Sequence, residues 1–150
     1  MSAPQSPDNE WQRIWFSIRQ HTWSSLALVP SHSGIDVVKV AQTLVATGRL
    51  QGERPVGLID ATGVQMSNIQ QVIGSLGTVA ERGEHAIVPV DAIQDNPSTI
   101  AIVQAASMAL LVVRLGESLL ASAQTTLDVV GRNRFIGSIV VDGAGNVSLR

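Results

Sequence analysis

The sequence predicts a single α/β domain in which a mostly parallel sheet of about five strands carries helices on both faces. Short apolar runs typical of buried strands alternate with segments whose apolar residues recur at helical spacing. This alternation is typical of parallel sheets whose crossover connections are helices. The 150 residues suffice for one such core, and a hydrophobic content of 45% is too high for a disordered chain. We expect residues 1–7 to form a flexible lead and residues 8–150 to form the domain.

The first helix is expected to begin at Asp8, since aspartate is a favourable residue at a helix N-terminus. Its apolar positions Trp11, Ile14, Trp15 and Ile18 follow the i, i+3, i+4, i+7 spacing of one helical face. The helix therefore has one apolar side that is rich in tryptophan.

The remaining elements alternate along the chain. Short apolar runs bounded by turn residues predict strands at residues 25–29, 55–60, 85–90, 108–113 and 135–141. Helices are expected from residue 37 to about Gly48, from Ser67 or Asn68, from Asn96 and Pro97, and from Ser118 to Gly131. A turn at residues 143–146 could then form a hairpin with a short terminal strand at 147–149.

Composition excludes several functional classes. The chain has no cysteine, so it has no disulfide, no Cys-ligated zinc and no thiol nucleophile. A net charge of −2 and a single lysine, Lys39, argue against a nucleic-acid partner. His21 and His85 lack the spacing of a metal pair, and we expect no metal site.

The start of the chain lacks a secretory pattern, and the longest apolar region, 100–115, is interrupted by polar residues. These features predict a cytoplasmic protein without direct membrane insertion.

The loop after the first expected strand is the place where such folds bind phosphate. It reads Ser-His-Ser-Gly-Ile-Asp-Val-Val-Lys. Against the P-loop pattern Gly34 remains, Asp36 takes the second glycine position, and Val37 and Val38 replace the lysine and the hydroxyl residue. A carboxylate repels phosphate, and valine can neither neutralise phosphate nor bind magnesium. Lys39 lies two positions too late, and we interpret it as an exposed surface residue.

The first helix and this loop also carry a resemblance to a known family. Glu10 and Arg13 match a Glu-x-x-Arg-x-x-Arg oligomerisation segment, in which Phe16 replaces the second arginine, and residues 34–44 align without a gap on a phosphate loop and its helix. The sequence resembles the deviant P-loop ATPases of the MinD/ParA type, in particular the cytoplasmic bacterial tyrosine kinases of capsule and exopolysaccharide synthesis. The resemblance extends over about residues 10–141.

Two further nucleotide motifs of this family depart from the pattern here. Asp60 matches the first aspartate of the second motif, but Thr62 replaces the second aspartate. In the third motif Pro89 replaces the metal-associated aspartate, and Asp91 and Ala92 replace two prolines. The framework is thus kept, while three motifs fail at the positions that handle the nucleotide.

The resemblance implies a P-loop-NTPase-like fold and, with these substitutions, the loss of ATP hydrolysis. We interpret the protein as a non-catalytic pseudo-ATPase or pseudo-kinase with no catalytic residue and no ATP or magnesium cofactor. The absence of tyrosine agrees, because kinases of this family carry a tyrosine-rich tail as phosphate acceptor. The implied role is a protein-interaction or regulatory scaffold in exopolysaccharide or capsule synthesis or export.

The resemblance also implies a protein partner: the cytoplasmic tail of a membrane polysaccharide co-polymerase, a related ATPase, or a second copy of this chain. The candidate interface residues are Glu10, Trp11, Arg13 and Trp15, since tryptophan and arginine are enriched at binding hot spots. The alternative interpretation is that the tryptophan-rich helix face packs on its own domain.

Two other functions stay open. A nucleotide-binding switch that holds ATP or ADP without appreciable hydrolysis would require backbone contacts around Ser33 and Gly34 to outweigh Asp36. An enzyme with unrelated chemistry has less support, because the sequence offers no paired carboxylates, metal cluster or activated nucleophile. We interpret Asp60 as a cap of its own loop and His32 as an ordinary polar loop residue.

Overall fold

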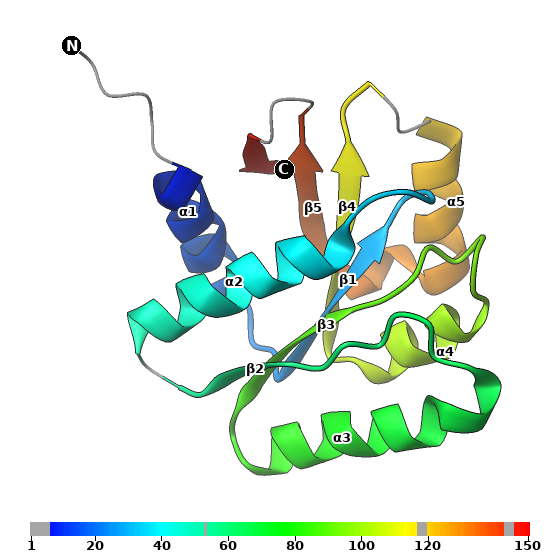
Figure 1. The fold of residues 1–150 in the computed structure, drawn as a ribbon, viewed down its shortest axis with the longest axis horizontal. Coiled ribbons are helices and arrows are strands. Elements are labelled where there is room, and N and C mark those ends of the chain that lie inside the picture. The colour runs from blue at the N-terminus through cyan, green and yellow to red at the C-terminus, as the bar shows by residue number, and fades with distance from the viewer. Residues whose placement is uncertain (1–6, 53, 117–119, 143–145) are drawn as a thin grey trace.

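The computed structural model describes residues 7–52, 54–116, 120–142 and 146–150, and it confirms the predicted α/β class (Figure 1). One six-stranded sheet is flanked by helices. In chain order the elements are α1 (Pro7–Arg19), β1 (Ser25–Pro30), α2 (Val37–Gln51), β2 (Val56–Leu58), η1 (Met66–Asn68), α3 (Ile69–Glu81), β3 (His85–Pro89), α4 (Ser98–Ala105), β4 (Met108–Arg114), α5 (Leu120–Val130), η2 (Arg132–Arg134), β5 (Phe135–Val141) and β6 (Val147–Leu149).

The sheet has the order β2-β3-β1-β4-β5-β6. The first five strands in this order pair in parallel, and β6 is the antiparallel partner of β5, which confirms the expected terminal strand. Residues 143–145 of the expected turn lie outside the described residues. β1 lies between β3 and β4. The connection that follows β1 runs to β2 at one edge of the sheet, whereas the connection that follows β3 runs in the opposite direction, to β4. Ligands of such folds bind at the carboxyl ends of the strands near this reversal.

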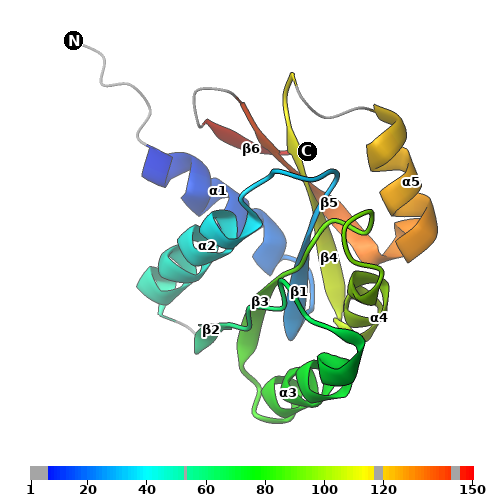
Figure 2. The ribbon, with the colours of Figure 1, turned by 45° about the vertical axis from the view of Figure 1, so that its right-hand side comes forward.

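Two apolar cores lie on the two faces of the sheet. In β1 the side chains alternate: Leu26 and Leu28 face the core formed with α1 and α2, while Ala27 and Val29 face the core formed with α3, α4 and α5. Figure 2 shows the two helical layers on opposite sides of the strands. All six residues of β1 are buried, which explains why the strand reads as a continuous apolar run rather than an alternating one.

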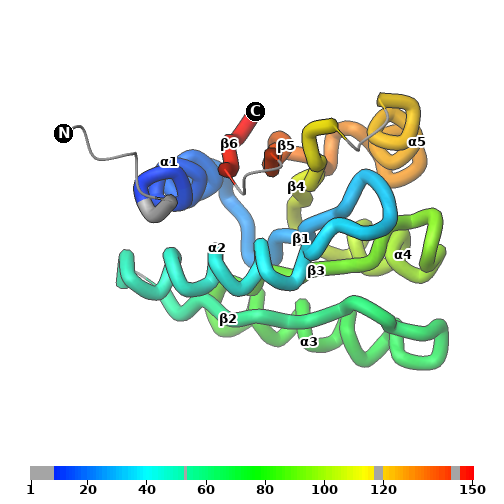
Figure 3. Tube along the Cα trace, turned by 45° about the horizontal axis from the view of Figure 1, so that its top comes forward, coloured from blue at the N-terminus to red at the C-terminus, as the bar shows by residue number. Residues whose placement is uncertain are grey.

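α1 packs against both α2 and β6 and thereby covers one edge of the first core (Figure 3). The helix begins at Pro7, which belongs to the expected lead, so Asp8 lies inside its first turn. Proline is favoured at the first position of a helix because its missing N–H has no partner there in any case. The rest of the lead, residues 1–6, and Ser118, the expected start of α5, lie outside the described residues.

Several predicted boundaries differ from the structure, and two of these differences concern Gly48 and Asp60. α2 continues through Gly48 to Gln51 and ends at Gly52, whose φ of 70° is the left-handed conformation typical of a glycine after a helix. Gly48 is a packing position instead: a Cβ atom there would lie 2.6 Å from Cη2 of Trp15. β2 covers only 56–58 of the expected 55–60, so Asp60 belongs to the loop that follows. Among the described residues, no helix is both long and apolar enough to cross a membrane.

Candidate functional site

The loop between β1 and α2 lies at the carboxyl edge of the sheet, where the phosphate site is expected. Gly34 has a φ of 90°, a conformation that favours glycine. Asp36 is the N-cap of α2, and its Oδ1 accepts a hydrogen bond from the backbone N–H of Lys39 at 3.1 Å. Val37 is buried in the first core, and Val38 packs against it from a half-buried position. The chain's own carboxylate thus caps the helix end that would bind an anion.

A cavity of about 240 Å³ opens beside this loop. Its walls come from the loop itself, from Thr62 and from the residues that follow β3. Three carboxylates, those of Asp36, Asp91 and Asp95, line it, and among the described residues no lysine or arginine does so. Ser33 donates a hydrogen bond from its Oγ to Oδ1 of Asp95 at 2.6 Å. The cavity is therefore acidic, and the acid groups are held by the loops around it.

The other motif positions also make structural contacts. Asp60 Oδ1 accepts hydrogen bonds from the backbone N–H of Thr62 at 2.9 Å and from its hydroxyl at 2.6 Å, which is the loop-capping contact that the sequence predicts. Pro89 is buried in β3, and its carbonyl accepts from the N–H of Ala61. Asp91 accepts from the N–H of Gly63 at 2.7 Å through its Oδ2. The described residues contain no group of three or more His, Asp or Glu placed to hold a metal ion.

The four candidate interface residues on α1 do not share one environment. Glu10 and Arg13 form an ion pair at 3.1 Å on the surface, and Trp11 is half-buried. Trp15, one of the candidate interface residues, is only 3% exposed, because its ring packs inside the domain against Gly48 of α2, as the alternative interpretation expected. The structure therefore brings Glu10, Trp11 and Arg13 to the surface and removes Trp15 from it.

Trp11 also lines a groove of about 420 Å³ between α1, α2 and the β5–β6 hairpin. Val40 contributes to its apolar wall, and Lys39, Arg114 and Asp142 contribute charges of both signs. The groove joins the exposed side of α1 to the start of α2. Neither the groove nor its charges were predicted from the sequence, since its walls come from segments about 100 residues apart.

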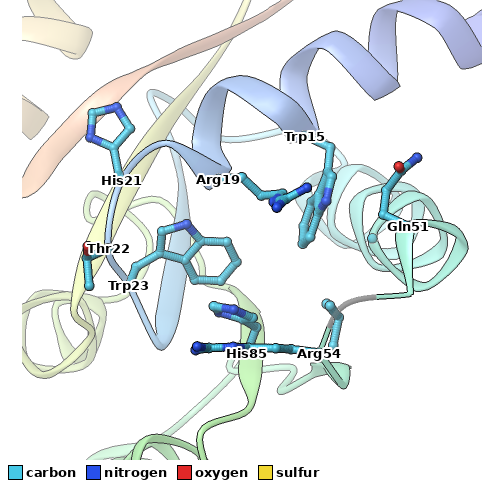
Figure 4. A pocket seen from close by; sticks show the side chains of 10 residues that line it. Trp15, Arg19, His21, Thr22, Trp23, Gln51, Arg54 and His85 are labelled. Atoms are coloured by element: carbon cyan, nitrogen blue, oxygen red, sulfur yellow. The ribbon is translucent and has the colours of Figure 1, made fainter.

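Sequence reasoning also missed a second cavity, which lies at the opposite, amino-terminal edge of the sheet (Figure 4). It has a volume of about 260 Å³, and its lining includes Arg19, Trp23, Arg54 and His85. These residues come from three separate stretches of the chain and follow no motif spacing. Gly48, which lies under the ring of Trp15, gave no clear signal, because a single sequence does not distinguish it from a glycine that ends a helix.

The chain was compared with known proteins by sequence and by structure. No family model matches the chain, and no curated protein matches its sequence. The structure is similar to that of the chimerical protein CapA2B2, with a TM-score of 0.75 and 8% identity over 94% of this chain and 87% of that chain. It is also similar to the kinase domain of the Escherichia coli tyrosine kinase ETK, with a TM-score of 0.67 and 13% identity over 87% of this chain and 72% of that chain. At these identities the likeness shows the fold alone, and the chain therefore shares the fold of a bacterial tyrosine kinase domain.

Proposed function

We propose that this protein is a non-catalytic scaffold built on a kinase-domain fold, which presents a surface to a protein partner in capsule or exopolysaccharide synthesis or export. The observation that carries the proposal is the carboxylate of Asp36, which caps α2 at the place where a P-loop would bind phosphate. The loss of ATP hydrolysis and the scaffold role rest on this contact and on the family resemblance together.

The electrostatics of the loop support the absence of turnover. A nucleotide phosphate would meet three carboxylates in the cavity, and like charges at short range repel one another. It would also have to displace the Asp36 cap, and such a cap contributes about 0.5–2 kcal/mol to helix stability. Val37 and Val38 offer no donor or metal ligand in return.

The surface of α1 supports a role in binding. Trp11 is half-buried beside the groove, the Glu10–Arg13 pair lies on the surface, and Phe16 is 45% exposed. Large aromatic side chains and arginine dominate the energetics of protein interfaces. The partner classes that fit are those of the family resemblance: a co-polymerase tail, a related ATPase, or a second copy of this chain.

Exchange of the interface residues tests this proposal. Trp11→Ala and Arg13→Ala are each expected to weaken capture of the partner from native cells at least tenfold, because hot-spot truncations cost about 2 kcal/mol or more. If the partner is a second copy, size-exclusion chromatography will show a smaller particle. Arg132→Ala is the control. Arg132 is an exposed arginine that follows α5 and forms an ion pair with Asp128 of that helix. Unchanged partner capture and particle size in both α1 variants would refute the proposed surface.

A nucleotide-binding switch is the second candidate, because the loop at Gly34 still borders a cavity at the carboxyl edge of the sheet. Isothermal titration calorimetry with Mg-ATP and Mg-ADP separates the two. We expect no saturable binding tighter than about 100 μM, which corresponds to about 5.5 kcal/mol. A smaller dissociation constant for either nucleotide would favour the nucleotide-binding switch over a scaffold that binds no nucleotide.

A further inference from the structure

The cavity at the amino-terminal edge of the sheet is built from the ends of several elements. Trp15 and Arg19 come from the last turns of α1, and Trp23 from the connection to β1. Arg54 precedes β2, and His85 is the first residue of β3. Figure 4 shows these side chains around one space. They lie at the amino-terminal ends of β1, β2 and β3, whereas the β1–α2 loop follows the carboxyl end of β1. The site is therefore separate from the acidic cavity.

Aromatic rings form two of its walls. Trp15 and Trp23 meet edge to face, with ring centroids 6.0 Å apart and an angle of 86° between the planes. Trp23 also lies against His85, with centroids 4.5 Å apart. The indole N–H of Trp23 donates to the carbonyl of Ile18 at 2.8 Å, and this bond fixes the ring. Rigid aromatic walls of this kind suit a flat ligand, because they lose little side-chain freedom on binding.

Most polar side chains that line the cavity are positively charged or can donate hydrogen bonds. Arg19 and Arg54 line it, and among its described lining residues no aspartate or glutamate is present. Burial lowers the pKa of His85, and the nearby guanidinium groups of Arg54 and, to a smaller extent, Arg19 lower it further. A backbone hydrogen bond with Trp23 raises the pKa, but the net shift is downward. The two guanidinium groups thus act on the imidazole as nearby positive charges, and positive charges attract anions.

Two buried nitrogen atoms of the lining side chains have no hydrogen-bond partner among the described residues. They are Nε1 of Trp15, an obligate donor, and Nδ1 of His85. Buried polar atoms are usually satisfied in native structures, and an atom without a protein partner calls for an explanation such as a bound water, an ion or a ligand. The side chains of both residues line the same cavity, although the two nitrogen atoms themselves are buried.

We propose that this cavity binds a small organic anion, with a carboxylate or phosphate group on a flat apolar body. The acid group pairs with Arg54, since a guanidinium matches either anion with two parallel hydrogen bonds. The flat body lies against Trp23 and Trp15. The volume of about 260 Å³ is below the range of drug-sized pockets, about 300–1,000 Å³, so one ring and its acid group fill it.

Phenyl phosphate and benzoate are the two acidic probes, and benzyl alcohol is the neutral one. The chain has three tryptophans, so a Trp11→Phe variant leaves only Trp15 and Trp23, both in the cavity, as fluorescent reporters. We expect a saturable fluorescence change with at least one acid, with a dissociation constant below about 1 mM. Calorimetry on the unaltered chain must give the same affinity. The acid that binds more tightly identifies the anionic group.

Arg54→Gln is expected to weaken binding of that acid at least tenfold, with the circular dichroism spectrum unchanged, because Arg54 is an exposed residue outside the helices and strands. Arg132→Gln, which alters an arginine outside the cavity lining, must leave the affinity unchanged. Three results would overturn the proposal. They are no saturation by either acid up to 10 mM, equal binding of benzyl alcohol, or full affinity in Arg54→Gln.

Discussion

Trp15→Ala is expected to lower the free energy of unfolding by about 3–5 kcal/mol, the usual cost of truncating a fully buried aromatic residue. The side chain is 3% exposed and contacts both α2 and Trp23, so its loss leaves a void between α1 and the sheet. Urea unfolding followed by circular dichroism measures the change. The result decides between the two interpretations of the tryptophan-rich face, because a residue of a surface interface would not affect the isolated chain in this way.

Trp11→Ala is the matched control, four residues earlier on the same helix. Trp11 is half-buried beside the groove, and its truncation should cost about 1 kcal/mol, the typical size of a single substitution. Equal losses at the two positions would mean that Trp15 does not hold its buried place in solution.

Gly48→Ala is expected to destabilise the protein by about 1–3 kcal/mol, although alanine is the better helix former. The new Cβ would lie 2.6 Å from Cη2 and 2.8 Å from Cζ2 of Trp15, closer than real Cβ contacts come. The indole also packs against Trp23 and the core, so a shift away from the new Cβ would cost it these contacts. Thermal or urea unfolding gives the sign directly.

Gly74→Ala provides the comparison for this prediction. Gly74 lies in the middle of α3, and a Cβ there would meet no atom within 4 Å. The same substitution is therefore expected to stabilise the protein by about 0.5–1 kcal/mol through helix propensity and chain entropy. If both glycine variants gain stability, the close contact between Gly48 and Trp15 is absent in solution.

The sequence predicts those parts of the fold that depend on local pattern. The apolar runs that became β1 and β4 are buried on both sides, and the period of the first helix placed Ile14, Trp15 and Ile18 on its inner face. The order of the strands could not be derived in this way, because it depends on contacts between distant segments. The end of α2 was misplaced at Gly48 for the same reason: a glycine after a helix and a glycine under a packed ring look alike in one sequence.

Only part of the candidate site could be predicted from the sequence. The β1–α2 loop and the positions of Asp36, Val37 and Val38 followed from a motif of consecutive residues, which a sequence displays directly. That Asp36 caps α2, and that Asp91 and Asp95 join it around one cavity, required the fold. The second cavity was missed altogether, because Arg54 and His85 carry no motif and meet only through the pairing of β2 with β3.

The two outer strands of the sheet limit how copies of this protein can associate. β2 and β6 each contain only three residues, and short edge strands leave few free backbone groups for a strand from another chain. Continuous sheets across a subunit boundary are therefore disfavoured at both edges. We therefore expect a partner to recognise this protein through side chains on its helices and grooves, so that specificity depends on individual residues such as Trp11 rather than on backbone pairing.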